Sequence, residues 1–245
     1  MTSPMRVLVF ASQKGGSGKT TLAGHIAVEA ERAGDGPVAL IDTDPQGSLS
    51  KWWNSRQVST PVFIQSVFSQ LYSDLQQIRQ ANYKLVVVDT PPAVTRAISE
   101  VVAVADLLVL PTRPSPHDLR AVGPTVDIAE SHKKPVIFAI NAATRRARIT
   151  SEAAVALSQH GTVAPVNIHN RVDFAASMID GRTVMETDPG GQSAEEIGEL
   201  WQYLKERLYR LEAPVAGSLD ERGAPLPNLN GLGQPSASFG RRAAQ

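Results

Sequence analysis

A glycine-rich segment with two lysines lies close to the start of the chain. Residues 13–21 read Gln-Lys-Gly-Gly-Ser-Gly-Lys-Thr-Thr, directly after an apolar run and directly before an amphipathic pattern. Glycines let consecutive backbone N–H groups curve around phosphate oxygens, a lysine can reach the terminal phosphates, and a threonine hydroxyl can bind Mg²⁺. The segment therefore predicts a site for a nucleoside triphosphate. The predicted binding residues are Gly15, Gly16, Ser17, Gly18, Lys19, Thr20 and Thr21, with Thr20 on the metal ion.

Carboxylates end two of the later apolar runs. Asp42 and Asp44 close the second run, and Asp89 follows four apolar residues in the third. Ligands of α/β proteins bind at the carboxyl edge of the sheet, where these side chains would emerge. The i, i+2 spacing predicts that Asp42 and Asp44 share one face of a strand. Asp89 is typical of a carboxylate that holds Mg²⁺ or its waters. The alternative for the first two is a turn or helix-cap role ahead of Ser48.

The elements that must position these residues alternate along the chain. Short β-rich runs at 6–11, 38–42, 85–89, 107–110 and 136–141 are separated by helical patterns. Leu22, Ile26 and Ala30 recur with helical spacing between the first two runs, and Gly34 stands where that helix would end. The alternation predicts an α/β fold with a mainly parallel, twisted sheet and helices on both faces. A final apolar stripe predicts a helix over about residues 194–211.

Composition limits the domain organisation and the chemistry. The 245 residues are 42% apolar and 20% charged, which fits one globular domain over residues 1–212. Residues 213–245 are rich in Gly, Pro, Ser and Asn, and we expect a disordered tail there. The absence of cysteine excludes disulfides and iron–sulfur sites and suits a reducing cytosol. With no signal peptide or membrane-length apolar segment, we expect a cytoplasmic protein.

The front of the glycine loop departs from the usual phosphate-loop pattern. Gln13 stands where glycine is usual, and Lys14 adds a second lysine. Lys-Gly-Gly-x-Gly-Lys-Thr resembles the deviant Walker A motif of the ParA/MinD superfamily, closest to small ParA/ParF-like partition ATPases without an N-terminal DNA-binding domain. The resemblance implies an ATPase that uses ATP and Mg²⁺, in which Lys14 crosses a dimer interface to the partner's nucleotide. It also implies that Asp44 positions the attacking water and that Asp42 supports the metal shell.

Two further segments resemble nucleotide-binding parts of that superfamily. Asn141 resembles the asparagine that hydrogen-bonds adenine, although an ordinary turn residue is the alternative. Residues 110–118 resemble the proline-rich stretch of ParF relatives, which lies at the nucleotide-facing dimer interface and implies a contact from Pro114. A purely structural role, as a stiff connection that begins a helix at about Ser115, is equally open.

Basic residues near the end of the chain resemble a DNA-binding block. Residues 170–174 and 181–186 resemble the ParA block before the last helix, in which basic side chains bind DNA without sequence preference. The resemblance implies DNA contacts from Arg171 and Arg182, to which we add Lys205, Arg207 and Arg210 of the last helix. Arg145, Arg146 and Arg148 form the densest basic cluster, which could contact DNA, nucleotide or only water. The net charge neither supports nor excludes DNA binding, because 24 basic residues balance 24 acidic ones.

These features together favour a nucleoid-associated positioning ATPase. ATP would produce a sandwich homodimer that binds DNA nonspecifically, and a ParB-like or cargo-adaptor protein would stimulate slow hydrolysis. The cargo would be a plasmid, a chromosome region or a protein assembly. One alternative is a MinD-like peripheral membrane ATPase, which residues 217–245 disfavour because they contain no apolar stripe. Another is a metabolic ATP-dependent enzyme on the same scaffold, and Lys14 argues against a kinase.

Overall fold

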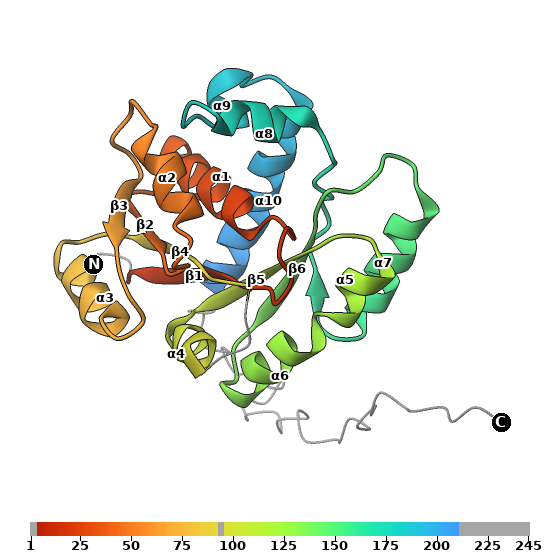
Figure 1. The fold of residues 1–245 in the computed structure, drawn as a ribbon, viewed down its shortest axis with the longest axis horizontal. Helices are drawn as coiled ribbons and strands as arrows, with labels where there is room; N and C mark the ends of the chain where they lie inside the picture. The colour runs from red at the N-terminus through yellow and green to blue at the C-terminus, as the bar shows by residue number, and fades with distance from the viewer. Residues whose placement is uncertain (1–3, 93–95, 211–245) are drawn as a thin grey trace, which may run out of the picture. The chain divides into compact units, whose positions relative to one another are not determined.

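The computed structural model describes residues 4–92 and 96–210, and within them the chain forms a seven-stranded parallel sheet (Figure 1). The strand order is β3-β2-β4-β1-β5-β6-β7, so β1 lies in the centre between β4 and β5. The strands are β1 (Arg6–Phe10), β2 (Val38–Asp42), β3 (Val62–Gln65), β4 (Leu85–Asp89), β5 (Leu107–Thr112), β6 (Val136–Ile140) and β7 (Thr162–Val163). The α/β fold with a parallel sheet, predicted from the alternation, is confirmed.

Helices connect the strands and cover both faces of the sheet (Figure 1). They are α1 (Lys19–Arg32), α2 (Ser48–Asn54), α3 (Leu71–Gln80), α4 (Arg96–Val104), α5 (Pro116–Arg120), α6 (Gly123–Ser131), α7 (Arg148–Ser158), α8 (Val172–Met178), α9 (Val184–Thr187) and α10 (Gln192–Arg210). None of the helices in these residues has the length and apolarity that crossing a membrane would require. The predicted domain boundary at 212 and the predicted tail over 213–245 lie outside the described residues.

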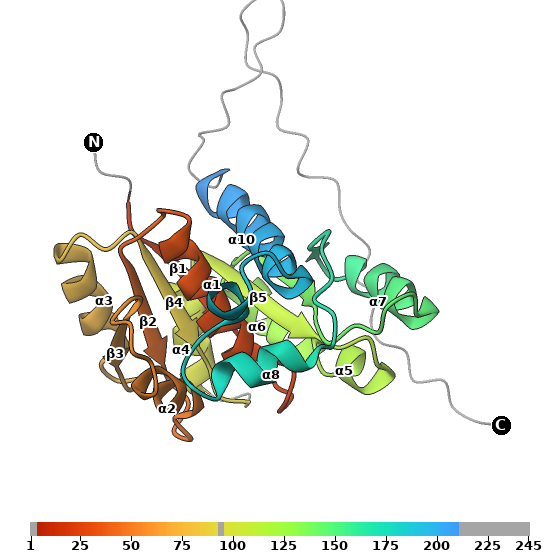
Figure 2. The same ribbon diagram turned by 90° about the horizontal axis from the view of Figure 1, so that it is seen from above.

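The core has two parts because successive side chains of a strand point to opposite faces of the sheet. Leu8 and Phe10 of β1 pack with α1, α2, α8, α9 and α10. Val7 and Val9 of the same strand pack with α3, α4, α6 and α7. On the first face α10 lies beside α1 (Figure 2), and Trp201 Nε1 donates to Asp35 Oδ2 at 2.9 Å. Both faces of the central strands are therefore buried, as the continuous apolar runs require.

The five predicted strands form where they were expected, with small differences at their ends. β3 and β7 were not predicted. β3 is a four-residue strand at the edge of the sheet with only half-buried apolar side chains, and β7 has two residues, so neither produces a recognisable apolar run. The last helix extends over 192–210 instead of 194–211, and Leu211 lies outside the described residues.

Candidate active site

The glycine loop connects β1 to α1 at the carboxyl edge of the sheet, in its centre. Gly16 and Gly18 have φ values of 73° and 98°, which lie in the left-handed region that favours glycine. A Cβ atom on Gly18 would lie 2.0 Å from Nδ2 of Asn141, so no larger residue fits without displacing that amide. The loop backbone is thus curved and open, the geometry in which N–H groups can surround phosphate oxygens.

Lys19 is the buried cation of this loop. Lys19 is the first residue of α1, and its Nζ lies 3.4 Å from the carbonyl oxygen of Lys14. Burial lowers the pKa of Lys19, while the negative charges of Asp89 and Asp44 act in the opposite direction. A phosphate group at the loop would give this partly desolvated ammonium a direct ion-pair partner, which it lacks among the described residues.

Lys14 has a different environment from Lys19. It is 38% exposed, and its Nζ lies 2.8 Å from Oδ2 of Asp118, which is only 5% exposed. The hydroxyl of Ser115 also donates to this carboxylate, and Ser115 is the N-cap of α5. Burial alone would raise the pKa of Asp118, but the hydrogen bonds from Lys14 and Ser115 outweigh it and hold the pKa below its ordinary value. The forward lysine is therefore held within its own chain, by an aspartate that the sequence analysis did not single out.

Thr20 and Asp89 meet beside the loop. The hydroxyl of Thr20 donates to Oδ2 of Asp89 at 2.6 Å, and the other carboxylate oxygen is buried without a partner among the described residues. Burial raises the pKa of Asp89 to about 7; the bond from Thr20 opposes this shift, and the charge of Asp42 adds to it. A hydroxyl and an unpartnered carboxylate oxygen suit the oxygen preference of Mg²⁺. Mg²⁺ bound there with ATP would neutralise charge on the β- and γ-phosphates.

Asp44 lies beyond β2 and not on the strand with Asp42, so that part of the prediction is wrong. β2 ends at Asp42, whose Cα pairs with that of Asp89 on β4, and Asp44 lies in the following turn. The carboxylate of Asp42 accepts from the backbone N–H groups of Asp44 at 2.9 Å and Ser50 at 3.0 Å. Asp42 thus stabilises the turn and the start of α2, the alternative considered from the sequence. Asp44 is half-exposed, with one oxygen bonded to the backbone N–H of Gln46, and its carboxylate is accessible to a water molecule.

A cavity of about 330 Å³ lies beside the loop at the ends of β5 and β6, whereas Asp89 ends β4 on the other side of β1. Gly16, Gly18, Thr21 and Asn141 contribute to its lining. Nδ2 of Asn141 donates to the carbonyl oxygen of Ser17 at 2.8 Å, so the predicted base-binding residue also holds the loop backbone. Pro114 is not among the residues that line this cavity, whereas its neighbour Arg113 is. The cavity has the place and size expected for the base and ribose of a nucleotide.

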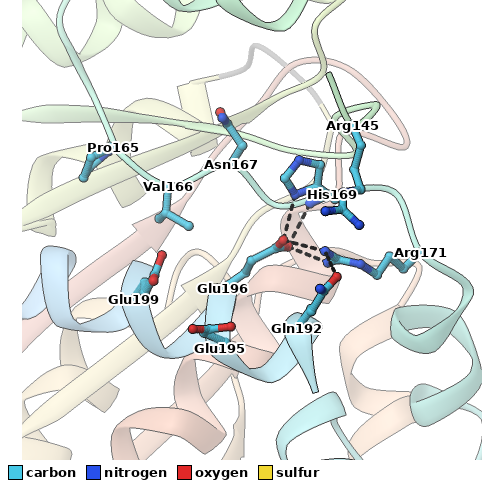
Figure 3. Close-up of a pocket in the computed structure, with 10 residues that line it drawn as sticks. All are labelled: Arg145, Pro165, Val166, Asn167, His169, Arg171, Gln192, Glu195, Glu196 and Glu199. Carbon is cyan, nitrogen blue, oxygen red and sulfur yellow. Dashed lines mark hydrogen bonds and ion pairs between the residues drawn. The ribbon is translucent and has the colours of Figure 1, made fainter. Parts of the chain in front are cut away.

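The predicted DNA-binding residues are mostly engaged within the chain. Arg171 makes two bonds of 2.7 Å to Glu196, which also accepts from His169 (Figure 3). Three others also have intramolecular partners: Arg182 pairs with Asp180, Lys205 pairs with Asp35, and Arg207 lies over the ring of Tyr203. Arg210, at the end of α10, is exposed and also takes part in an interaction. The sequence could not reveal these partners, and the ion pairs of Arg171, Arg182 and Lys205 reduce the positive charge that the block offers to phosphate.

The second basic cluster is more accessible. Arg145 and Arg146 are exposed in the loop between β6 and α7, and Arg146 adopts a φ of 58°. Arg148 pairs with Glu152 at 2.7 Å on the surface of α7. The two loop arginines therefore present charge to solvent near the nucleotide cavity, since the loop begins directly after Asn141.

Comparison with known proteins identifies a family and a fold. A model of the CobQ/CobB/MinD/ParA nucleotide binding domain matches residues 8–219. Maintenance of carboxysome distribution protein A of Halothiobacillus neapolitanus is 30% identical over 209 residues, covering 79% of this chain and 93% of that protein. Protein ParA of Rhizobium radiobacter is 34% identical over 116 residues, covering 46% of this chain and 51% of that protein.

Solved structures of the same fold have lower sequence identity. An ATP complex of a Cyanothece McdA variant has a TM-score of 0.68 and 17% identity, covering 84% of this chain and 97% of that one. Septum site-determining protein MinD of Pyrococcus horikoshii, complexed with Mg-ADP, has a TM-score of 0.70 and 14% identity, covering 83% and 97%. At these identities the likeness establishes the fold alone.

Proposed function

We propose that this chain, which belongs to the CobQ/CobB/MinD/ParA nucleotide-binding family, is a ParA-type positioning ATPase. In this proposal the protein dimerises with ATP and moves a cargo over DNA. The chain is an ATPase that uses ATP with Mg²⁺, as this family does. We propose that hydrolysis serves to change the association state of the protein and not to transfer phosphate to a metabolite.

The observation that supports this use best is the pair of lysines in the loop. Lys19 lies inside the phosphate site of its own chain, whereas Lys14 lies at the exposed front of the loop. A lysine at that front suits contact with a nucleotide in a second copy. In such a sandwich dimer, contacts to the γ-phosphate would be lost after hydrolysis, and the dimer would separate.

Hydrolysis uses residues of the site described above. Lys19 neutralises charge on the transferred phosphate, and backbone N–H groups of the loop hold the other phosphate oxygens. Asp44, whose half-exposed carboxylate can reach solvent, orients the attacking water. Asn141 and the cavity beside it receive the base. Because Lys14 would act in the partner's site, turnover by one chain alone would be slow, and an adaptor protein would accelerate it.

DNA is the proposed surface on which the dimer moves, which would make the protein nucleoid-associated. Among the basic residues, we assign the first contacts to Arg145 and Arg146, since four of the residues of the later block are engaged within the chain. The cargo is a large protein assembly in our proposal, because a relative matched over most of both chains is named for carboxysome distribution. The similarity to a ParA protein favours a plasmid or chromosome region as the second candidate.

Binding to a nonspecific DNA duplex, measured across a salt series, tests the proposal. Wild type with ATP, with ADP and without nucleotide is compared with the double variant Arg145→Ala/Arg146→Ala, while light scattering follows the oligomeric state. We expect binding confined to an ATP-dependent dimer, and a log–log salt slope for each chain that falls by about 2 in the double variant. Arg148→Ala is the control, because Glu152 already pairs with that arginine. A dimer that forms with ATP but ignores DNA would refute the DNA proposal.

A further inference from the structure

Arg113 lies over the phosphate loop, in a position that no motif of the loop predicts. It follows the last residue of β5, and β5 pairs directly with β1, which leads into the loop. A Cβ atom on Gly16 would lie 3.4 Å from Nη2 of Arg113, so the guanidinium is in contact range of the loop. The same side chain lines the cavity that Gly18, Thr21 and Asn141 help to form.

The backbone holds Arg113 in this place from both sides. The carbonyl oxygen of Thr112 accepts from the backbone N–H of Asn141 at 2.9 Å, and that of Arg113 accepts from the N–H of Ser115 at 2.7 Å. Pro114 lies within the second contact, between Arg113 and Ser115, and its fixed φ limits the conformations that the chain can adopt there. The guanidinium is therefore carried on a constrained segment rather than on a free loop.

The guanidinium of Arg113 also differs from the other cations around the cavity and the loop. Arg171 is bound twice by Glu196, and Lys14 is bound by Asp118. Within residues 4–92 and 96–210, the exposed side chain of Arg113 makes no hydrogen bond or ion pair, although its charge acts on Asp118, so its donors are available. A guanidinium with free donors next to a phosphate loop matches the geometry in which arginine binds phosphate through two parallel bonds.

We infer that Arg113 binds the α- and β-phosphates of the nucleotide held by its own chain. Loop backbone such as that of Gly16 surrounds the α- and β-phosphates in sites of this type, whereas the lysine and the metal ion act on the β- and γ-phosphates. Arg113 contacts the loop at Gly16 and follows β5 on one side of β1, whereas Asp89, which binds Thr20, ends β4 on the other side. Arg113 therefore tightens the binding of both ATP and ADP and leaves the hydrolytic step to other residues. This inference rests on the ATP site and is independent of the proposed DNA binding and cargo.

Affinities of the Arg113→Ala variant for three probes test the inference. Calorimetric titration with Mg-ATP, Mg-ADP and inorganic tripolyphosphate should show a loss of about tenfold or more for each in Arg113→Ala, the scale of a charge-assisted bond. Arg113→Lys should keep part of the affinity because it keeps the charge without the planar fork. Arg120→Ala is the matched control: it removes an exposed arginine from the same segment, outside the cavity lining, and should change affinity less than about twofold.

Other outcomes overturn the inference in distinguishable ways. Unchanged affinity of Arg113→Ala for all three probes refutes a phosphate contact. Weaker ATP and ADP binding with unchanged tripolyphosphate binding moves the guanidinium to the base or ribose. A large fall of kcat at saturating ATP, with unchanged Kd, makes Arg113 a residue of the hydrolytic step or of a partner's site. If wild type itself binds no nucleotide, the assignment of the ATP site fails instead.

Discussion

Replacing Asp89 with asparagine should stabilise the protein in the absence of nucleotide. The carboxyl is fully buried at the end of β4, and burial raises its pKa from 3.8 to about 7, with Thr20 opposing and Asp42 adding to the shift. Ionisation is therefore easier in the unfolded chain than in the folded one. The loss of folding stability that this difference causes is absent below about pH 4. It grows as the pH rises and reaches about 4 kcal/mol above about pH 7. Asparagine keeps the size of the side chain and an acceptor for Thr20, but carries no charge.

Urea unfolding of wild type and Asp89→Asn without nucleotide or Mg²⁺ measures this difference. We expect the variant to be more stable by about 4 kcal/mol at about pH 8 and by about 2 kcal/mol at about pH 5, since titrations shared by the two proteins cancel. The same variant should lose Mg²⁺-dependent ATP hydrolysis. A variant that is equally stable or less stable at about pH 8, or a difference that does not grow with pH, would refute the assigned cost of this buried carboxylate.

Three further changes have defined outcomes. Gly18→Ala forces a Cβ atom to within 2.0 Å of Asn141 Nδ2 at a φ of 98°, so thermal melting should show a loss of about 1–3 kcal/mol and titration should show no ATP binding. Asp118→Asn releases Lys14, so light scattering should detect the ATP-dependent dimer at a protein concentration about tenfold lower; an unchanged concentration would contradict a restraining role. Burial lowers the pKa of His25 to about 4, so wild type should lose about 3 kcal/mol more stability than His25→Gln as the pH falls from about 6.5 to about 4, a difference that denaturant unfolding measures.

Much of the fold follows from local patterns in the sequence. Apolar runs of four or more residues identify the central strands, because these strands are buried on both faces and tolerate almost no polar residue. The edge strand β3 escapes such a pattern, since one of its sides has no neighbouring strand and its apolar side chains are only half-buried. The prediction that Asp44 lies on the second strand failed because sequence spacing does not show where a strand ends and a turn begins.

The part of the site that one continuous segment of the chain forms was predictable from the sequence. The loop over 13–21 requires glycines and a lysine at fixed spacing, so its composition alone indicates phosphate binding. The residues around it were not predictable in the same way. Lys14 and Asp118 are 104 positions apart, and the pairing of β1 with β5 brings their segments together. Likewise, the sequence does not distinguish Arg171 from any other arginine. Its ion pair with Glu196, which only the structure shows, neutralises its charge within the chain.

The sequence by itself determined that the protein binds a nucleoside triphosphate, because one short segment encodes the backbone geometry that surrounds a phosphate. It also determined the layered architecture, because burial on two faces leaves a readable apolar pattern. The tertiary structure decided which charged groups are available: it holds Lys14 on Asp118, engages Arg171 with Glu196, and leaves the guanidinium of Arg113 over Gly16. The physical reason is that the free energy of a charge depends on neighbours within a few ångströms, and those neighbours come from distant parts of the chain.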